Sequence, residues 1–136
     1  TRLHFTITPE GLIQGESVPQ GLLASILTTE EMLPCVGQGA IGLEIREGDD
    51  RLATICERLN DTDTFYCVTA ERSFLAAMGG GCQSPVAAYA AVDHSNIKMR
   101  ALSFASGPVR RAEAQKPAAQ AAELGWDLAT TLKGAA

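Results

Sequence analysis

Residues 85–104 read PVAAYAAVDHSNIKMRALSF and predict an antiparallel hairpin. Residues 85–92 form a short apolar run, and Ile97, Met99 and Ala101 then recur with the period of two that is typical of a half-buried strand. Asp-His-Ser-Asn at positions 93–96 supplies the turn between them. A second turn at residues 106–108 precedes residues 109–114, which we expect to form a third strand, at the sheet edge because it carries arginines.

Two helices are predicted to flank these strands. The first begins near Thr62 or Asp63 and ends at the glycines of positions 79–81, and the second has Pro117 near its start and Gly134 at its end. Each helix carries one apolar face: Cys67, Ala70, Phe74 and Met78 in the first, and Ala121, Leu124, Leu128 and Leu132 in the second. A three-stranded antiparallel sheet with helices on one face makes α+β the predicted fold class.

The chain before residue 62 is expected to hold one more helix and one more strand. Apolar side chains recur with helical spacing behind Asp49-Asp50, which can cap the amino end of a helix: Leu52, Ile55, Cys56 and Leu59. Residues 41–46 alternate apolar and other side chains, which predicts a half-buried strand that follows the glycine-containing segment 36–39. Residues 5–20 are rich in turn residues and are expected to form a surface loop.

Composition argues against several classes of function. The net charge is −5 and the 11 basic residues are scattered, so nucleic acid is not expected as a partner. The four cysteines contain no C-x-x-C pair and neither histidine has zinc-ligand spacing from them, so no metal site is expected and the cysteines are predicted to be free thiols. Residues 74–92 carry no charge, but glycines and Pro85 interrupt them, which indicates two elements and a turn rather than a membrane span. Because the chain begins at Thr1 rather than methionine, we interpret it as a fragment.

The turn at residues 79–85, GGGCQSP, places Cys82 directly after three residues without side chains. Consecutive glycines suit a tight turn or the close approach of a bulky group. These residues alone leave two interpretations open: a small buried cysteine beside a helix-to-strand turn, or a sulfur that a ligand can reach. No basic side chain lies near Cys82 in the sequence, so any activation of the sulfur must come across space.

Three blocks of sequence favour the second interpretation. Residues 32–42 read MLPCVGQGAIG, residues 69–75 read TAERSFL and residues 80–86 read GGCQSPV. Together, and in register from about Glu30 to the end of the chain, they closely resemble the porphobilinogen deaminases, also called hydroxymethylbilane synthases, of haem and chlorophyll biosynthesis. The resemblance implies that residues 1–47 are the tail of a second α/β domain with the strand that returns to the first domain. It implies that residues 48–136 are the C-terminal α+β domain that carries the cofactor.

The resemblance also implies a reaction. Enzymes of this family are transferases that condense four porphobilinogen units into hydroxymethylbilane, with release of ammonia, on a dipyrromethane cofactor bound by a thioether to the cysteine matching Cys82. Such a thioether needs only an accessible nucleophilic sulfur that attacks a pyrrole methylene electrophile. The family resemblance further implies a cytoplasmic protein, or a plastid stromal one in a plant or alga, that is a monomer when intact.

Besides Cys82, the resemblance points to Gly81, Gln38 and Arg2 as cofactor-binding residues. The amide of Gln38 can donate and accept hydrogen bonds to the cofactor, although Gln38 could instead cap a strand entry shaped by its neighbouring glycines. Arg2 could match an arginine that contacts substrate carboxylates, or it could be a solvated terminal residue. Arg72 fits an interdomain ion pair better than a substrate contact.

No residue of the chain matches the family's catalytic aspartate, which the resemblance places in the amino-terminal domains with most substrate-binding arginines. We therefore predict no catalytic residue here and no activity for the chain alone. Its expected partners are porphobilinogen, the growing polypyrrole and the missing N-terminal domains. Two other hypotheses stay open: a non-catalytic α+β interaction module in which Cys82 is only a turn cysteine, and a cysteine hydrolase, for which neither His94 nor His4 is a convincing base.

Overall fold

The structure is a computed structural model that describes residues 4–15, 18–19, 21–81, 83–105 and 107–134. It divides into two compact units, Thr1–Met32 and Leu33–Ala136. The first unit contains two short antiparallel strands, β1 (Phe5–Ile7) and β2 (Ile13–Gly15). The prediction that residues 5–20 are only a surface loop is therefore wrong. The backbone of Thr8 bonds to Gly11 and Leu12, and Gly11 takes a positive φ of 82°, so the turn residues close a hairpin.

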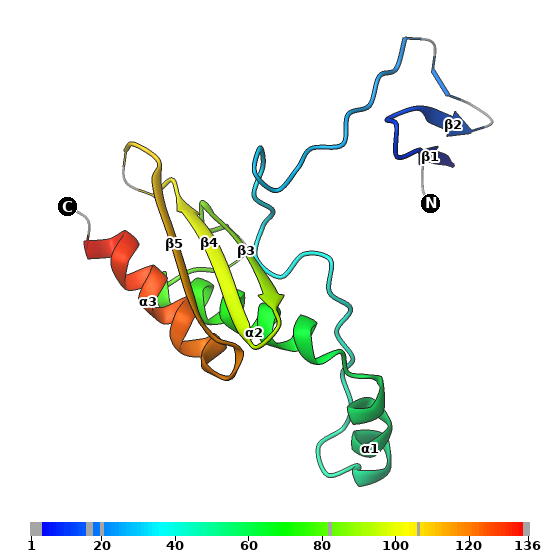
Figure 1. The fold of residues 1–136 in the computed structure, drawn as a ribbon. Coiled ribbons are helices and arrows are strands. Elements are labelled where there is room, and N and C mark those ends of the chain that lie inside the picture. The colour runs from blue at the N-terminus through cyan, green and yellow to red at the C-terminus, as the bar shows by residue number, and fades with distance from the viewer. Residues whose placement is uncertain (1–3, 16–17, 20, 82, 106, 135–136) are drawn as a thin grey trace. The chain divides into compact units, whose positions relative to one another are not determined.

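The second unit is built on the sheet that the sequence predicts. Strands β3 (Val86–Asp93), β4 (Asn96–Ser103) and β5 (Arg110–Pro117) are antiparallel and lie in that order (Figure 1). Ala88 faces Ala101 and Asp93 faces Asn96, so the connection between β3 and β4 is a tight turn, in which His94 has a φ of 55°. β5 is an edge strand as predicted, and it extends to Pro117, which pairs with Asn96.

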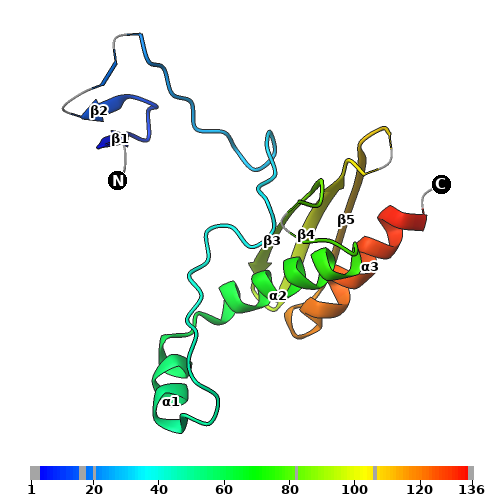
Figure 2. The same cartoon turned by 180° about the vertical axis from the view of Figure 1, so that it is seen from behind.

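Two helices cover one face of this sheet, as Figure 2 shows from behind. Helix α2 (Thr62–Ala77) begins where expected, because the carboxylate of Asp61 accepts a hydrogen bond of 2.8 Å from the N–H of Thr64. Helix α3 (Ala121–Gly134) follows a short 3₁₀ helix, η1 (Ala118–Gln120). The α+β fold class with a three-stranded antiparallel sheet is confirmed.

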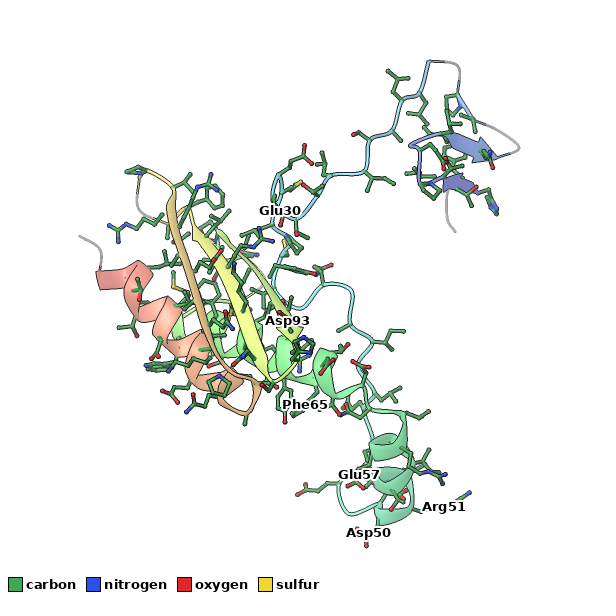
Figure 3. All side chains as sticks on the ribbon, viewed as in Figure 1. Glu30, Asp50, Arg51, Glu57, Phe65 and Asp93 are labelled. Carbon is green, nitrogen blue, oxygen red and sulfur yellow. The ribbon has the colours of Figure 1, made fainter. Side chains whose placement is uncertain are left out.

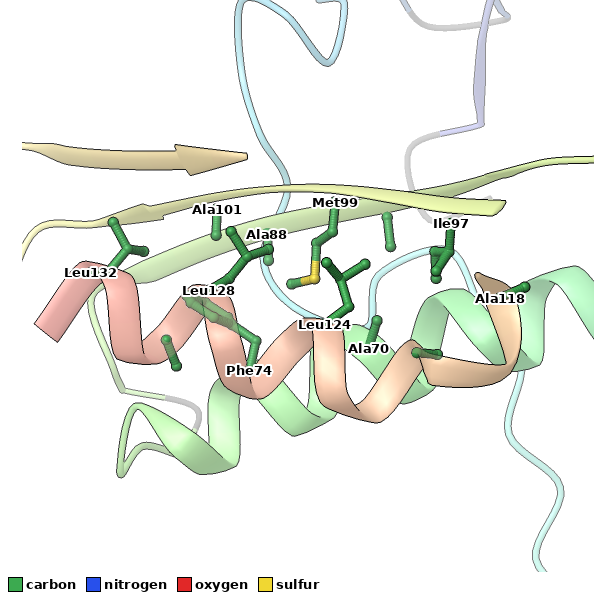
Figure 4. Close-up of a cluster of buried hydrophobic side chains, with 13 residues drawn as sticks. Ala70, Phe74, Ala88, Ile97, Met99, Ala101, Ala118, Leu124, Leu128 and Leu132 are labelled. Atoms are coloured by element: carbon green, nitrogen blue, oxygen red, sulfur yellow. The ribbon is translucent and has the colours of Figure 1, made fainter. Parts of the chain in front are cut away.

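The core lies between the sheet and the two helices (Figure 4). Its largest fully buried side chains come from α2, β4 and α3: Phe74, Ile97, Met99, Leu124 and Leu128. The helices approach closely at Gly125, where an added Cβ would clash with the carbonyl oxygen of Ala70 and lie 2.7 Å from the nitrogen of Phe74. Both predicted apolar helix faces therefore point into one core.

Within residues 33–61, the structure contains the predicted helix but not the predicted strand. Residues 40–46 form no regular secondary structure, so the predicted strand is absent; Ile41 and Leu43 are 92% and 63% exposed. A strand needs a neighbouring strand for its backbone groups, and no strand of the described residues pairs with this segment. Helix α1 (Asp50–Leu59) is present and Asp49 caps it, but none of its residues is buried.

Candidate functional site

The turn after α2 leads to the predicted cofactor cysteine. Cys82 and Arg2 themselves lie outside the described residues. The helix ends at Ala77 with Met78 as its C-cap, Gly79 has a φ of 78°, and the N–H of Gly80 donates to the carbonyl of Leu75 at 3.2 Å. Gly81 is exposed, and a Cβ added to it would meet nothing within 4 Å. Gly80 differs, because a Cβ added to it would clash with the side chain of Ser84.

Gln38 lies in a second glycine turn, at residues 36–39. Gly37 and Gly39 both have positive φ, 72° and 79°, so the backbone on each side of Gln38 is in the left-handed region that favours glycine. The side chain of Gln38 is exposed, whereas Val36 packs against the core. The turn is therefore anchored on one side and presents Gln38 to solvent.

The structure ties this turn to the sheet through Glu71, a residue of α2. The Glu71 side chain is only 6% exposed, and its two oxygens have different partners. Oε2 accepts a hydrogen bond of 2.7 Å from the N–H of Gly37, and Oε1 accepts one of 2.9 Å from the N–H of Ala90 in β3. One carboxylate thus joins α2, the turn that carries Gln38 and the strand that follows Cys82.

Burial raises the pKa of Glu71, while its two backbone hydrogen bonds act in the opposite direction. Sequence reasoning assigned no role to this residue. A signal was present, because Glu71 lies four positions after Cys67 and three before Phe74, which places a carboxylate on the apolar side of the helix. A charged residue at a core position needs partners, and here they are backbone amides.

The thiols in the described residues are free at Cys35, Cys56 and Cys67. Burial, followed by the nearby charge of Glu71, raises the pKa of the Cys67 thiol. Cys35 is exposed and Cys56 is half-buried. Among the residues that the structure describes, no group of three potential metal ligands lies together.

A hollow of about 500 Å³ lies between residues 37–43 and the ends of α1 and α2 that adjoin it. Its lining is mixed, with Leu59 and Phe65 as apolar groups and Asp61 and Arg72 as charged ones. Arg72 is exposed here, and its predicted role in an interdomain ion pair stays a prediction. No helix in the described part of the chain has the length and apolar character needed to cross a bilayer.

These features define a class of protein, an α+β domain with a cysteine in the turn between a helix and a strand. In this domain a buried glutamate joins strand β3 to a glycine turn. Residues 65–134 match the family described as "Porphobilinogen deaminase, C-terminal domain", and the chain belongs to this family.

Three curated relatives, each named porphobilinogen deaminase, agree with this assignment. The protein of Syntrophotalea carbinolica is 43% identical over 112 residues, which are 81% of this chain and 36% of the relative. The protein of Paracoccus denitrificans is 42% identical over 109 residues, 79% of this chain and 35% of the relative. That of Staphylococcus aureus is 36% identical over 113 residues, 82% of this chain and 37% of the relative. The chain therefore spans about a third of the length of these relatives.

Proposed function

We propose that this chain is the cofactor-carrying C-terminal part of a porphobilinogen deaminase, with Cys82 holding a dipyrromethane primer through a thioether. The observation that carries the proposal is the family match over residues 65–134, which includes the turn with Cys82 between α2 and β3. The reaction of the whole protein is then the condensation of four porphobilinogen units into hydroxymethylbilane, with release of ammonia.

The residues on each side of Cys82 are accessible to solvent, which supports this proposal. Gly81 and Gln83 are exposed, and a Cβ added to Gly79 or Gly81 would meet nothing within 4 Å, whereas one added to Gly80 would clash with Ser84. When bound, the primer supplies the pyrrole carbon to which new units are added. In this proposal Cys82 anchors it, Gly81 leaves room for it, the Gln38 amide hydrogen-bonds to it, and Arg2 pairs with pyrrole carboxylates.

The substrates and partners follow from the same proposal. Porphobilinogen and the growing polypyrrole bring carboxylates that need arginine partners, and the N-terminal domains of the same protein supply most of them, together with the catalytic aspartate. The chain alone, which spans about a third of its relatives, is therefore inactive in this proposal. The intact protein acts as a monomer in the cytoplasm, or in the stroma of a plastid.

Mass spectrometry of the longest natural form of the protein tests the proposal. The peptide with Cys82 should carry the added mass of a dipyrromethane, and Cys82→Ser should remove both this mass and hydroxymethylbilane formation. Cys35→Ser is the matched control, because Cys35 is a free and exposed cysteine outside the turn with Cys82, and it should leave both unchanged. An unmodified Cys82 thiol in freshly purified full-length protein would instead favour the non-catalytic interaction module.

A further inference from the structure

The edge of β3 that faces away from β4 forms hydrogen bonds to groups that are not part of a strand. β3 pairs with β4 on one side only, so backbone N–H groups on its other side need different partners. The N–H of Ala88 donates to the carbonyl of Pro34 at 3.1 Å, and the N–H of Ala90 donates to the carboxylate of Glu71 at 2.9 Å. Along the described part of this edge, a short piece of chain and one side chain replace a further strand.

The same carboxylate bonds to the turn that follows Pro34. Its second oxygen accepts from the N–H of Gly37 at 2.7 Å, and Gly37 directly precedes Gln38. A carboxylate accepts at both oxygens, so here it satisfies one N–H donor at each, whereas an amide side chain accepts at only one of its two terminal atoms. Hydrogen bonds to a charged acceptor are also stronger than those between neutral groups.

We propose that Glu71 is a positioning residue that fixes the turn of residues 37–39 against the β3 edge, and thereby sets where Gln38 stands relative to the turn that carries Cys82. The roles of Gln38 and Cys82 in this statement rest on the proposed function. The contacts of Glu71 do not, because they are hydrogen bonds within the folded domain. Glu71 touches neither substrate nor primer in this proposal and acts only through the backbone that it holds.

Amide hydrogen exchange in the full-length protein tests the contacts. In Glu71→Gln, one of the two N–H donors must face an NH₂ group, so the amides of Gly37 and Ala90 should exchange roughly tenfold faster. The amide of Leu128, in the middle of α3, should keep its rate. Glu57→Gln, which makes the same change on the exposed surface of α1 (Figure 3), should change none of these rates.

If Glu71→Gln fails to fold, amide exchange in the unmodified protein still tests the proposal. The amide of Gly37 should exchange at least about tenfold more slowly than in an unstructured peptide. A Gly37 amide that exchanges at the unprotected rate would overturn the proposal, and so would a folded Glu71→Gln variant with unchanged exchange at Gly37 and Ala90.

Turnover separates positioning from a purely structural role. Glu71→Gln with the primer loaded on Cys82 should lose roughly tenfold in kcat, because a displaced positioning group affects the reacting geometry. Glu57→Gln should keep the kcat of the unmodified protein. Faster exchange at Gly37 with unchanged kcat would overturn the positioning role. If the peptide with Cys82 carries no added mass in the unmodified protein, the proposed function fails, and the exchange rates still decide whether Glu71 fixes the turn.

Discussion

Two segments of this chain have the same sequence pattern and opposite structures. Residues 41–46 and residues 97–102 both place apolar side chains at alternate positions. The second segment is the centre of β4, with Ile97 and Met99 fully buried between the sheet and the helices. The first forms no strand, and Ile41 is 92% exposed. The alternation specifies which side chains share a face, but a strand forms only where neighbouring backbone supplies hydrogen-bond partners.

Helices α1 and α2 also share a sequence feature and differ in how many of their residues are buried. Asp49 and Asp61 cap α1 and α2 with nearly equal hydrogen bonds, 3.0 and 2.8 Å long. α2 buries Ala70, Glu71 and Phe74, whereas α1 buries no residue. Local signals therefore predict where a helix starts, while tertiary contacts decide how much it contributes to the stability of the domain.

The largest expected effect compares the two isoleucines. Ile97→Ala removes a fully buried side chain and should lower the free energy of unfolding by about 2 to 5 kcal/mol. Ile41→Ala removes an exposed one and should change it by about 0.5 kcal/mol or less. Urea unfolding followed by circular dichroism measures both. If both variants lost the same free energy of unfolding, residues 41–46 would be packed, and the contrast between the two segments would be wrong.

Two glycines sharpen the contrast between packed and open positions of one helix. Gly125→Ala places a Cβ against the backbone of α2 at Ala70 and Phe74, so the helices must separate, at a cost of about 1 to 3 kcal/mol. Gly134→Ala, where nothing lies within 4 Å, serves as the control. If thermal unfolding gave both variants the same melting temperature, the close approach of α2 and α3 would be wrong.

The two caps should respond differently to the same substitution. Asp61→Ala removes the cap of a helix that forms part of the core, so it should lower the melting temperature of the domain by a few degrees. Asp49→Ala should reduce the helical signal of α1 and leave the main unfolding transition in place, because α1 buries no residue. Calorimetry measures the temperature of the main unfolding transition, and circular dichroism measures the helix content. A shift of the main transition by Asp49→Ala would contradict the independence of α1.

The smallest expected effect concerns pH. Burial raises the pKa of Glu71 above 4.5, so between pH 4.5 and the raised value the folded state binds more protons than the unfolded state. The free energy of unfolding should therefore rise relative to that of Glu71→Gln as the pH falls from neutral toward 4.5. The exposed carboxyls with a lowered pKa, Glu10, Glu31 and Asp61, act with the opposite sign and mainly at lower pH. Urea unfolding at the two pH values measures the difference, and parallel curves for both proteins would count against a buried Glu71.

Much of the fold followed from residue patterns. The hairpin over residues 85–104 was predictable because alternation and turn residues coincide, and the apolar face of α3 was predictable from its helical spacing. Glu71 was not assigned a role, because its partners are the backbone amides of Gly37 and Ala90, which lie 34 and 19 positions away. Backbone amides are the same in every sequence, so no residue pattern marks them as partners.

The amino-acid sequence was sufficient to predict features that depend on local chemistry: helix caps, glycines at helix ends, and helical and strand periods. It also carried the family resemblance from which the role of Cys82 is proposed. The tertiary structure alone decided which of these elements became part of the core, and it placed the Gln38 turn at the edge of β3. The physical reason is that local propensities concern one segment at a time. Burial and backbone pairing require a second segment at the right distance, and only the folded chain provides it.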